Sequence, residues 1–263
     1  MTNERRVLIH SDKQSLAGSV AARFIIKIVD LLDEQDEVTV AVTGGSMGAA
    51  VLEAIRDSPA RDTIDWGRVS IWWGDERWLP RADAERNEVQ SRAALLDHVA
   101  IDESKIHPFP ASDDGIELDA AAEQFAAELA AHAPEGATHP RFDIVFLGVG
   151  PDGHIASLFP ESSGVQETEK TVIPVRNSPK PPAERLSLTL PVINAADRIW
   201  LVLAGADKAA PLGLTLAGAS LYEVPAAGVE GRKRTVFFVD NEAAAEVPEN
   251  LRSPGLFWTS ENA

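Results

Sequence analysis

The sequence has 263 residues, of which 44% are hydrophobic and 25% are charged, so the chain is long enough to bury a sizeable core. Asp and Glu outnumber Lys and Arg by 41 to 24, and the formal net charge of −17 disfavours nucleic acids and anionic membranes as partners. The chain contains no cysteine, which excludes disulfides, thiolate metal sites and cysteine nucleophiles.

The chain begins with a strong helical pattern and then a β pattern. Residues 11–14 (Ser-Asp-Lys-Gln) predict a capping box, and the apolar positions after it recur every four residues, as in a helix. These positions are Leu16, Val20, Phe24, Ile28 and Leu32. The β-rich run 38–42 predicts a strand, the glycines of 44–46 interrupt it, and a second helix is expected over about 47–56.

Further elements follow in alternation. Residues 69–73 predict a strand that ends at the polar cluster 74–77, and helices are expected over 86–99 and 118–131. The continuous apolar run 143–149 is typical of a strand that is buried on both faces. Later runs predict strands over 171–175, 186–190, 199–204 and 234–239, and a helix over 206–216.

Strands that alternate with helices predict an α/β fold in three layers, with a mostly parallel central sheet between helices. The Pro-rich segment 178–182 is expected to be a loop, because the alternation continues beyond it. We therefore expect one domain over 1–263, as a monomer or a weak homo-oligomer. Residues 1–9 contain too short an apolar run for a signal peptide, and no run is long enough for a membrane span, so we expect a cytoplasmic protein.

Polar clusters lie at the ends of the predicted strands. They are Thr43–Ser46, Asp75–Arg77 and Gly150–His154, and Lys208 follows a fourth strand. In open α/β sheets, ligands bind beyond the carboxyl ends of the strands, so these clusters predict one shared site. An anionic ligand would need such local positive charge, because the chain as a whole is acidic.

Two glycine motifs have alternative interpretations. Residues 44–48 match G-x-S-x-G, but a hydrolase nucleophile elbow needs earlier strands and a late histidine, whereas the last histidine is His154. A tight turn or a phosphate cradle of backbone N–H groups remains. Residues 148–153 match G-x-G-x-x-G, but a loop-like segment follows and Pro151 lacks an N–H, which disfavours a dinucleotide site.

The six histidines show no helical metal spacing, so no metal site is expected, although carboxylates elsewhere could still bind Mg²⁺. His98 and His107 are expected to be surface or capping residues. His154 differs, because it stands beside a glycine turn at the end of the most apolar strand, and it is the candidate functional histidine.

At these residues the sequence resembles the 6-phosphogluconolactonases. The matching segments are 43–46, 72–77, 86–87, 147–160, 179–182, 185–189 and 205–209, in family order. The block G-x-G-x-D-G-H-x-A-S-L-F-P over 148–160 is highly specific, whereas the Gly-Gly-Ser turn alone is weak. Met47-Gly48 departs from the pattern, since many relatives have Thr-Pro there, and any role for a hydroxyl at position 47 is lost.

The resemblance implies hydrolysis of 6-phospho-D-glucono-1,5-lactone to 6-phospho-D-gluconate in the pentose phosphate pathway. It also implies the fold of the glucosamine-6-phosphate deaminases, whose activity is the nearest alternative. A sugar-phosphate sensor without turnover is a further alternative, but such modules usually lack the histidine or carry a DNA-binding segment. The implied partner is a small phosphorylated sugar lactone.

Imidazole exchanges protons near neutral pH, so His154 is the expected general base, with Asp75 orienting His154 or the water. The phosphate is expected to bind the backbone of Gly44, Gly45 and Ser46 together with the side chains of Arg77 and Lys208. Lys180 and Arg185 are expected to help hold the phosphate or the oxyanion. Gly150, Asp152 and Gly153 are expected to shape the turn. Neither a metal nor an organic cofactor is expected to take part.

Overall fold

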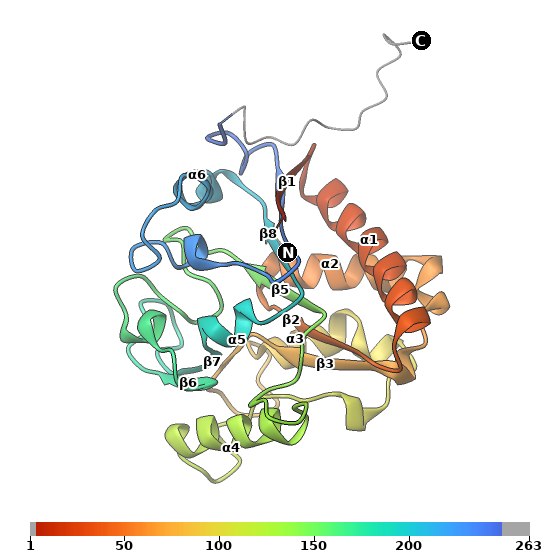
Figure 1. Ribbon diagram of the computed structural model, residues 1–263, viewed down its shortest axis with the longest axis vertical. Helices are drawn as coiled ribbons and strands as arrows, with labels where there is room; N and C mark the ends of the chain where they lie inside the picture. Colours follow the sequence, from red (N-terminus) through yellow and green to blue (C-terminus); the bar gives the residue numbers. More distant parts are fainter. Residues whose placement is uncertain (1–3, 249–263) are drawn as a thin grey trace.

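The computed structural model describes residues 4–248 (Figure 1). The domain expected over 1–263, and residues 1–9, in which no signal peptide is expected, both lie partly outside the described residues. Six parallel strands form the central sheet, in the order β1-β9-β8-β5-β2-β3. Their bounds are β1 Glu4–His10, β2 Val38–Val42, β3 Val69–Trp73, β5 Ile144–Gly148, β8 Arg198–Leu203 and β9 Arg234–Asp240.

The inner strands are apolar because helices or loops cover both faces of the sheet. Every residue of β3 is buried, and in β5 only Gly148 is partly exposed. Such continuous burial is typical of parallel sheets. Strand β1 was not predicted. It lies at the edge of the sheet, begins with charged residues, and of its apolar run only Val7 is fully buried.

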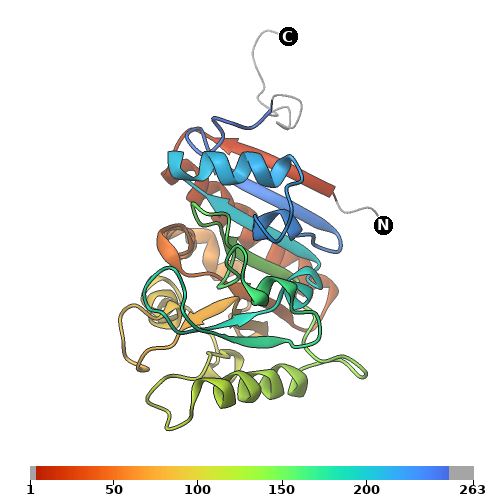
Figure 2. The ribbon, with the colours of Figure 1, turned by 90° about the vertical axis from the view of Figure 1, so that its left-hand side faces the viewer.

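Helices cover both faces of the central sheet, which confirms the expected three layers. On one face, α1 (Lys13–Glu34) packs against α2 (Gly45–Asp57), and α2 packs against α3 (Asn87–Ala94). On the opposite face lies α6 (Ala209–Leu216), on the left in Figure 1 and in front of the strands in Figure 2. In the described residues, no helix has both the length and the apolar character of a membrane span.

The predicted stripe of α1 is confirmed, because all five of its apolar positions are buried. The cap is one residue later than the expected capping box. Asp12 rather than Ser11 is the N-cap, and its carboxylate accepts a hydrogen bond of 2.8 Å from the backbone N–H of Ser15. The hydroxyl of Ser11 instead lies 2.8 Å from a carboxylate oxygen of Asp12 and 2.9 Å from the hydroxyl of Ser15.

Two predicted helices are shorter than expected. The helix predicted over 86–99 ends at Ala94, and residues 96–98 form a 3₁₀ turn. Ala94, Leu95 and Leu96 are all buried, and three consecutive buried positions do not fit one face of an α-helix. The helix predicted over 206–216 likewise begins as a 3₁₀ turn before α6 starts at Ala209.

A second, small sheet was not predicted. It contains β4 (Asp75–Arg77), β7 (Arg185–Leu188) and β6 (Val172–Val175), which pair antiparallel in the order β4-β7-β6. Helix α4 (Leu118–Ala131) packs against β6, so in Figure 2 the small sheet lies between the central sheet and α4. The short helix α5 (Leu190–Asn194) follows β7 directly.

Candidate active site

A cavity of about 310 Å³ collects the polar clusters from the strand ends. Its walls include every residue predicted to be catalytic or to bind the substrate: Gly44, Gly45, Ser46, Asp75, Arg77, His154, Lys180, Arg185 and Lys208. Gly150 lines it too, whereas Asp152 and Gly153 are not part of the wall. The cavity is therefore a single place where these side chains can act on one molecule.

Three strands of the central sheet deliver their following loops to the cavity. Residues 43–46 follow β2, residues 149–154 follow β5, and residues 204–208 follow β8. These strands are neighbours in the sheet and run parallel, so their carboxyl ends lie together. The small sheet contributes Asp75 and Arg77 from β4 and Arg185 from β7.

The glycine turn presents the N-terminus of α2 to the cavity. Gly44 is the N-cap, and no side chain caps the helix, so the first backbone N–H groups are available to an anion. A side chain at position 44 would collide with the Asn87 amide, so the turn has room only for glycine. Gly45 has a φ of +80°, which also favours glycine.

His154 is held by the turn that follows β5. The backbone N–H of Gly150 donates to the His154 carbonyl at 2.9 Å, and that of Gly153 donates to the Gly150 carbonyl at 2.9 Å. The Nδ1 atom of His154 lies 2.5 Å from Oδ1 of Asp152, and the imidazole packs at 4.6 Å from the ring of Phe159. A carboxylate that accepts from Nδ1–H leaves Nε2 with the free lone pair.

Asp152 is ionised at this position. Burial raises its pKa, but the hydrogen bond from His154 and the positive charge of Lys180 oppose burial and hold the pKa well below its usual range. The Nζ atom of Lys180 lies 3.7 Å from Oδ1 of Asp152. Asp152 therefore does more than shape the turn, because it contacts the imidazole directly.

In the described residues no hydrogen bond or ion pair joins Asp75 to His154, and its expected role, to orient His154 or the water, stays a prediction. Its Oδ2 accepts a hydrogen bond of 2.7 Å from the hydroxyl of Ser157, and its Oδ1 accepts one of 3.3 Å from the amide of Asn87. Arg185 NH1 lies 4.0 Å from Oδ2. Asp152 contacts the imidazole because it shares a five-residue turn with His154, whereas Asp75 belongs to strand β4.

Two arginines of the small sheet are paired across neighbouring strands. Arg77 of β4 and Arg185 of β7 are paired in the antiparallel register, and both line the cavity. Arg185 is 7% exposed and donates to the carbonyls of Pro181 at 3.0 Å and Pro182 at 3.2 Å. Its pKa is lowered by burial, while Asp75 opposes that effect. Arg77 NH1 donates to the carbonyl of Glu85.

A buried ionic network, for whose residues no role was predicted, supports this wall. The carboxylate of Glu76 accepts hydrogen bonds from the backbone N–H groups of Arg77, Asn87 and Glu88 at 2.8, 2.7 and 2.9 Å. Arg86, fully buried, lies 3.8 Å from Glu76 and also donates to the carbonyl of Phe109. The network fixes the start of α3 against β4, and this positions Asn87 between Gly44 and Asp75.

The alternative motif interpretations have no support in the fold. No α-helix follows the 148–153 turn directly, and the next element is the 3₁₀ turn Ser163–Gln166, so a dinucleotide fold is absent there. In the described residues, no hydrogen bond or ion pair joins Ser46 to a histidine, as a serine nucleophile would require.

Comparison with known proteins places the chain in a family. The family described as glucosamine-6-phosphate isomerases/6-phosphogluconolactonase matches residues 11–238. A protein of Streptomyces coelicolor named 6-phosphogluconolactonase is 49% identical over 258 residues, covering 97% of this chain and 99% of the relative. One of Mycobacterium tuberculosis with the same name is 41% identical over 242 residues, covering 91% and 97%.

Solved structures share the fold. The 6-phosphogluconolactonase of Trypanosoma brucei superposes with a TM-score of 0.80 at 25% identity, over 94% of this chain and 100% of that one. A monomeric glucosamine-6-phosphate deaminase superposes with a TM-score of 0.76 at 18% identity, over 92% and 99%. At that identity, the likeness to the deaminase concerns the fold alone.

Proposed function

The chain belongs to the family of glucosamine-6-phosphate isomerases and 6-phosphogluconolactonases, and we propose that it hydrolyses 6-phospho-D-glucono-1,5-lactone to 6-phospho-D-gluconate. The observation that carries this proposal is the pairing of His154 with Asp152 at 2.5 Å in a cavity that also contains Arg77, Arg185 and Lys208. Ester hydrolysis needs a base, and a phosphorylated substrate needs cations. The relatives at 41–49% identity carry the lactonase name, which favours this activity over deamination.

The base in this proposal is Nε2 of His154. Asp152 accepts from Nδ1–H and stabilises the imidazolium that forms when Nε2 removes a proton from the attacking water. The water adds to the lactone carbonyl carbon and the carbonyl oxygen becomes an oxyanion. When the ring C–O bond breaks, the leaving ring oxygen takes a proton, and the imidazolium is the expected donor. Asp75 is 7% exposed and is placed by Ser157, so it is proposed to orient the water.

The phosphate is proposed to bind at the N-terminus of α2, where Gly44, Gly45 and Ser46 offer backbone N–H groups. Lys208 supplies a point charge and Arg77 a planar pair of donors. Arg185 is rigid, because three backbone carbonyls of residues 180–182 hold its guanidinium, and we assign it with Lys180 to the oxyanion. Rigid donors stabilise developing charge without reorganisation.

We further propose that the chain acts as one domain in the cytoplasm and takes a small phosphorylated sugar as its partner, as a monomer or a weak homo-oligomer without nucleic acid or membrane. A cysteine-free chain suits a reducing compartment, and the net charge of −17 opposes polyanionic partners. The proposed chemistry uses side chains and backbone N–H groups and takes neither a metal nor an organic cofactor.

One assay separates the candidate functions. The purified protein is given the phosphorylated lactone, and loss of lactone is followed against spontaneous hydrolysis. Ammonia release from glucosamine 6-phosphate is measured in parallel. Fast lactone loss without ammonia supports the lactonase, ammonia without lactone loss supports the deaminase, and binding of the sugar phosphate without either reaction supports a sensor.

A further inference from the structure

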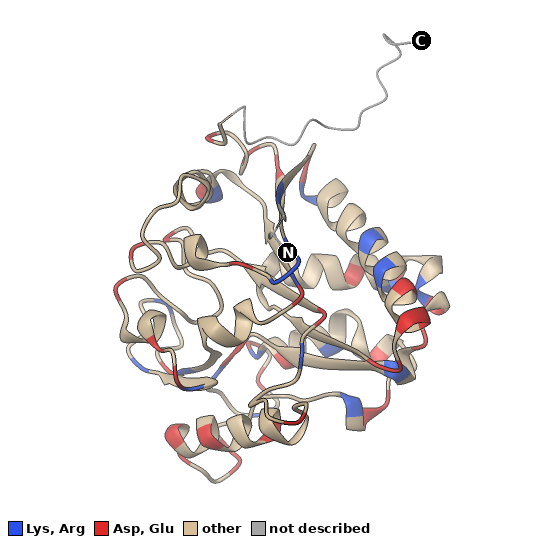
Figure 3. Cartoon of the chain, viewed as in Figure 1, with Lys and Arg blue, Asp and Glu red and all other residues tan. Residues whose placement is uncertain are grey.

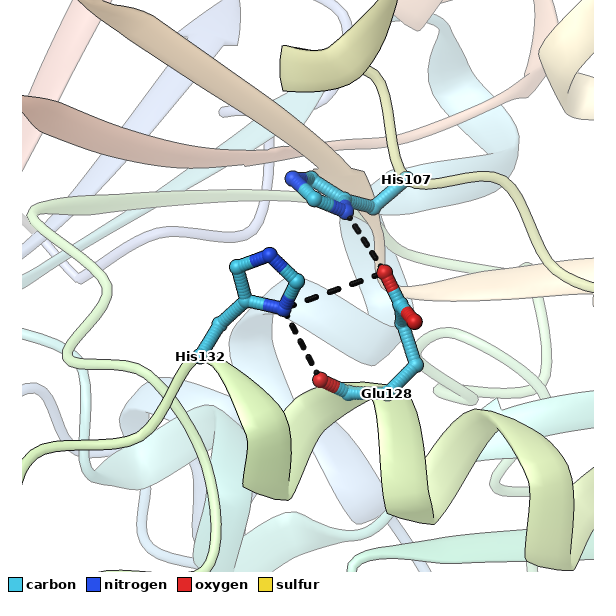
Figure 4. Close-up of side chains that lie close together, drawn as sticks. All are labelled: His107, Glu128 and His132. Carbon is cyan, nitrogen blue, oxygen red and sulfur yellow. Dashed lines mark hydrogen bonds and ion pairs between the residues drawn. The ribbon is translucent and has the colours of Figure 1, made fainter.

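Three possible metal ligands meet at the carboxyl end of α4, outside the cavity already described. They are His107, Glu128 and His132 (Figure 4), and their ligand atoms all lie within 4.8 Å of one another. Nδ1 of His107 is 2.9 Å from Oε1 of Glu128, and Nδ1 of His132 is 3.8 Å from the same oxygen. None of the three lines the active-site cavity.

The cluster is held from two directions. The backbone N–H of His107 donates to the carbonyl of Ile71 in β3 at 2.9 Å, and its ring stacks on the indole of Trp72 at 4.0 Å. His107 is therefore buried, which corrects the expectation of a surface or capping residue. Glu128 and His132 are four residues apart at the end of α4, and this spacing places them on one face.

The hydrogen bond between His107 and Glu128 does not explain why the imidazole of His132 lies beside them. The rings of His107 and His132 are only 4.4 Å apart, at an angle of 68°. A neutral imidazole is the form that coordinates a metal.

The surroundings favour a cation. Helix α4 carries Asp119, Glu123 and Glu128 and has neither Lys nor Arg (Figure 3). The carboxylate of Glu37 adds negative charge near His107, although it is paired with Lys105. Glu128 and His132 are each more than 40% exposed in their side chains, so an ion has a path from solvent and water can fill a remaining position.

We propose that His107, Glu128 and His132 form a binding site for a divalent transition-metal ion of the zinc class, which joins the end of α4 to the edge of the central sheet. Two imidazoles and one carboxylate suit zinc far better than magnesium or calcium, which prefer all-oxygen sites. His132 would exchange the contact of its Nδ1 with the Glu128 carbonyl, at 3.0 Å, for the metal. The proposal is independent of the lactonase reaction.

The test is zinc binding to chelator-treated, dialysed protein by titration calorimetry. The full chain is compared with Glu128→Gln and His132→Ala, whose exposed side chains should not be needed for folding. His98→Ala is the matched control, because His98 is also an exposed histidine that contacts a backbone carbonyl after a helix, at 3.0 Å from Ala93. His154→Ala serves to remove any zinc that binds in the active-site cavity.

We expect the wild type, His98→Ala and His154→Ala each to bind one zinc ion at this site. Glu128→Gln and His132→Ala should bind zinc roughly 10²-fold or more weakly, because the loss of a ligand costs at least as much affinity as the loss of a residue that orients one. Magnesium and calcium should not compete. Zinc should raise the melting temperature of the wild type but not of Glu128→Gln, while lactonase turnover stays the same in both. No zinc binding by the wild type, or equal binding by Glu128→Gln and His132→Ala, would overturn the proposal.

Discussion

Arg77 and Arg185 occupy directly opposed positions in the β4–β7 pair, on the wall of the active-site cavity. Like charges opposite each other across an antiparallel pair destabilise the sheet. An anion between or beside the two guanidinium groups removes this repulsion, so the arrangement favours the ligand-bound state over the free one.

Arg77→Met is therefore expected to separate binding from folding. A charge-assisted contact contributes about 1.5–3 kcal/mol, so kcat/KM for the phosphorylated lactone should fall roughly 10- to 150-fold. The free energy of unfolding of the ligand-free protein should change by less than about 1 kcal/mol, because relief of the repulsion offsets the lost contact with Glu85. Arg176→Met is the control, since Arg176 pairs with Asp119 away from the cavity. A large loss of stability with unchanged kcat/KM would refute this view of Arg77.

The pair of His154 and Asp152 predicts two graded losses of turnover. His154→Ala should lower kcat by roughly 10²–10⁴, the usual range for a positioned general base. Asp152→Asn should lower kcat by roughly 10- to 150-fold, because it removes a charge-assisted hydrogen bond while the imidazole remains. Initial rates are measured after subtraction of spontaneous hydrolysis. An unchanged kcat in Asp152→Asn would refute the role of Asp152 as the partner of the imidazole.

Gly150 has no side chain, and we predict that this leaves the space that the imidazole of His154 occupies. A side chain at position 150 would collide with Nδ1 of His154 and with the Asp152 carboxylate, whereas one at position 148 meets nothing closer than 3.9 Å. We expect Gly150→Ala to lower kcat by at least 10-fold, because a displacement of the base of about 1 Å can cost about 10²-fold. Gly148→Ala should retain activity. Equal kinetics of the two variants would show that the turn can move without harm.

Lys208 is predicted to bind the phosphate of the substrate. It lines the cavity, and its ion pair of 2.8 Å is with the exposed Asp207. Lys208→Ala should lower kcat/KM for the phosphorylated lactone by roughly 10- to 150-fold and leave the poor hydrolysis of unphosphorylated glucono-1,5-lactone unchanged. Lys233→Ala is a matched control, since Lys233 also pairs with an aspartate at 2.8 Å but lies outside the cavity. An equal loss on both lactones would remove Lys208 from phosphate recognition.

Glu76 predicts a dependence of stability on pH. Burial raises the pKa of Glu76 from 4.5 to about 7, although Arg86 and three backbone N–H groups oppose this. Because the folded state binds this proton more tightly, the stability that Glu76 contributes is fully present below about pH 4.5 and is lost as the pH rises to about 7. The free energy of unfolding of the wild type should therefore fall relative to that of Glu76→Gln as the pH rises over that range, by up to about 3 kcal/mol. A rise in the free energy of unfolding of the wild type relative to Glu76→Gln would mean that the ion pair with Arg86 outweighs burial.

The central sheet and the location of the site could be predicted from the sequence because they depend on local patterns. The stripe from Leu16 to Leu32 and the run 143–149 each carry their own periodicity, and strand ends bring turn residues together whatever the rest of the chain does. The Gly44 turn and His154 were identifiable for this reason.

The features that were missed depend on pairings between distant segments. The strand Asp75–Arg77 is short and polar, and becomes a strand only by pairing with residues 185–187. The burial of His107 depends on the carbonyl of Ile71 and the indole of Trp72, which its own neighbours in the sequence do not reveal. Strand-end proximity makes both Asp75 and Asp152 candidate partners of His154, and only side-chain contacts distinguish them.

The position of β1 has a consequence for synthesis of the chain. In the described residues, β1 has β9 as its one neighbour in the sheet, although the two strands lie at opposite ends of the sequence. A chain made from its N-terminus can form β2, β3, β5 and β8, and with them the site, while β1 still waits for its partner. Among the described strands, β1 is thus made before the others, and both β1 and β8 keep an unpaired edge until residues 234–240 have been added.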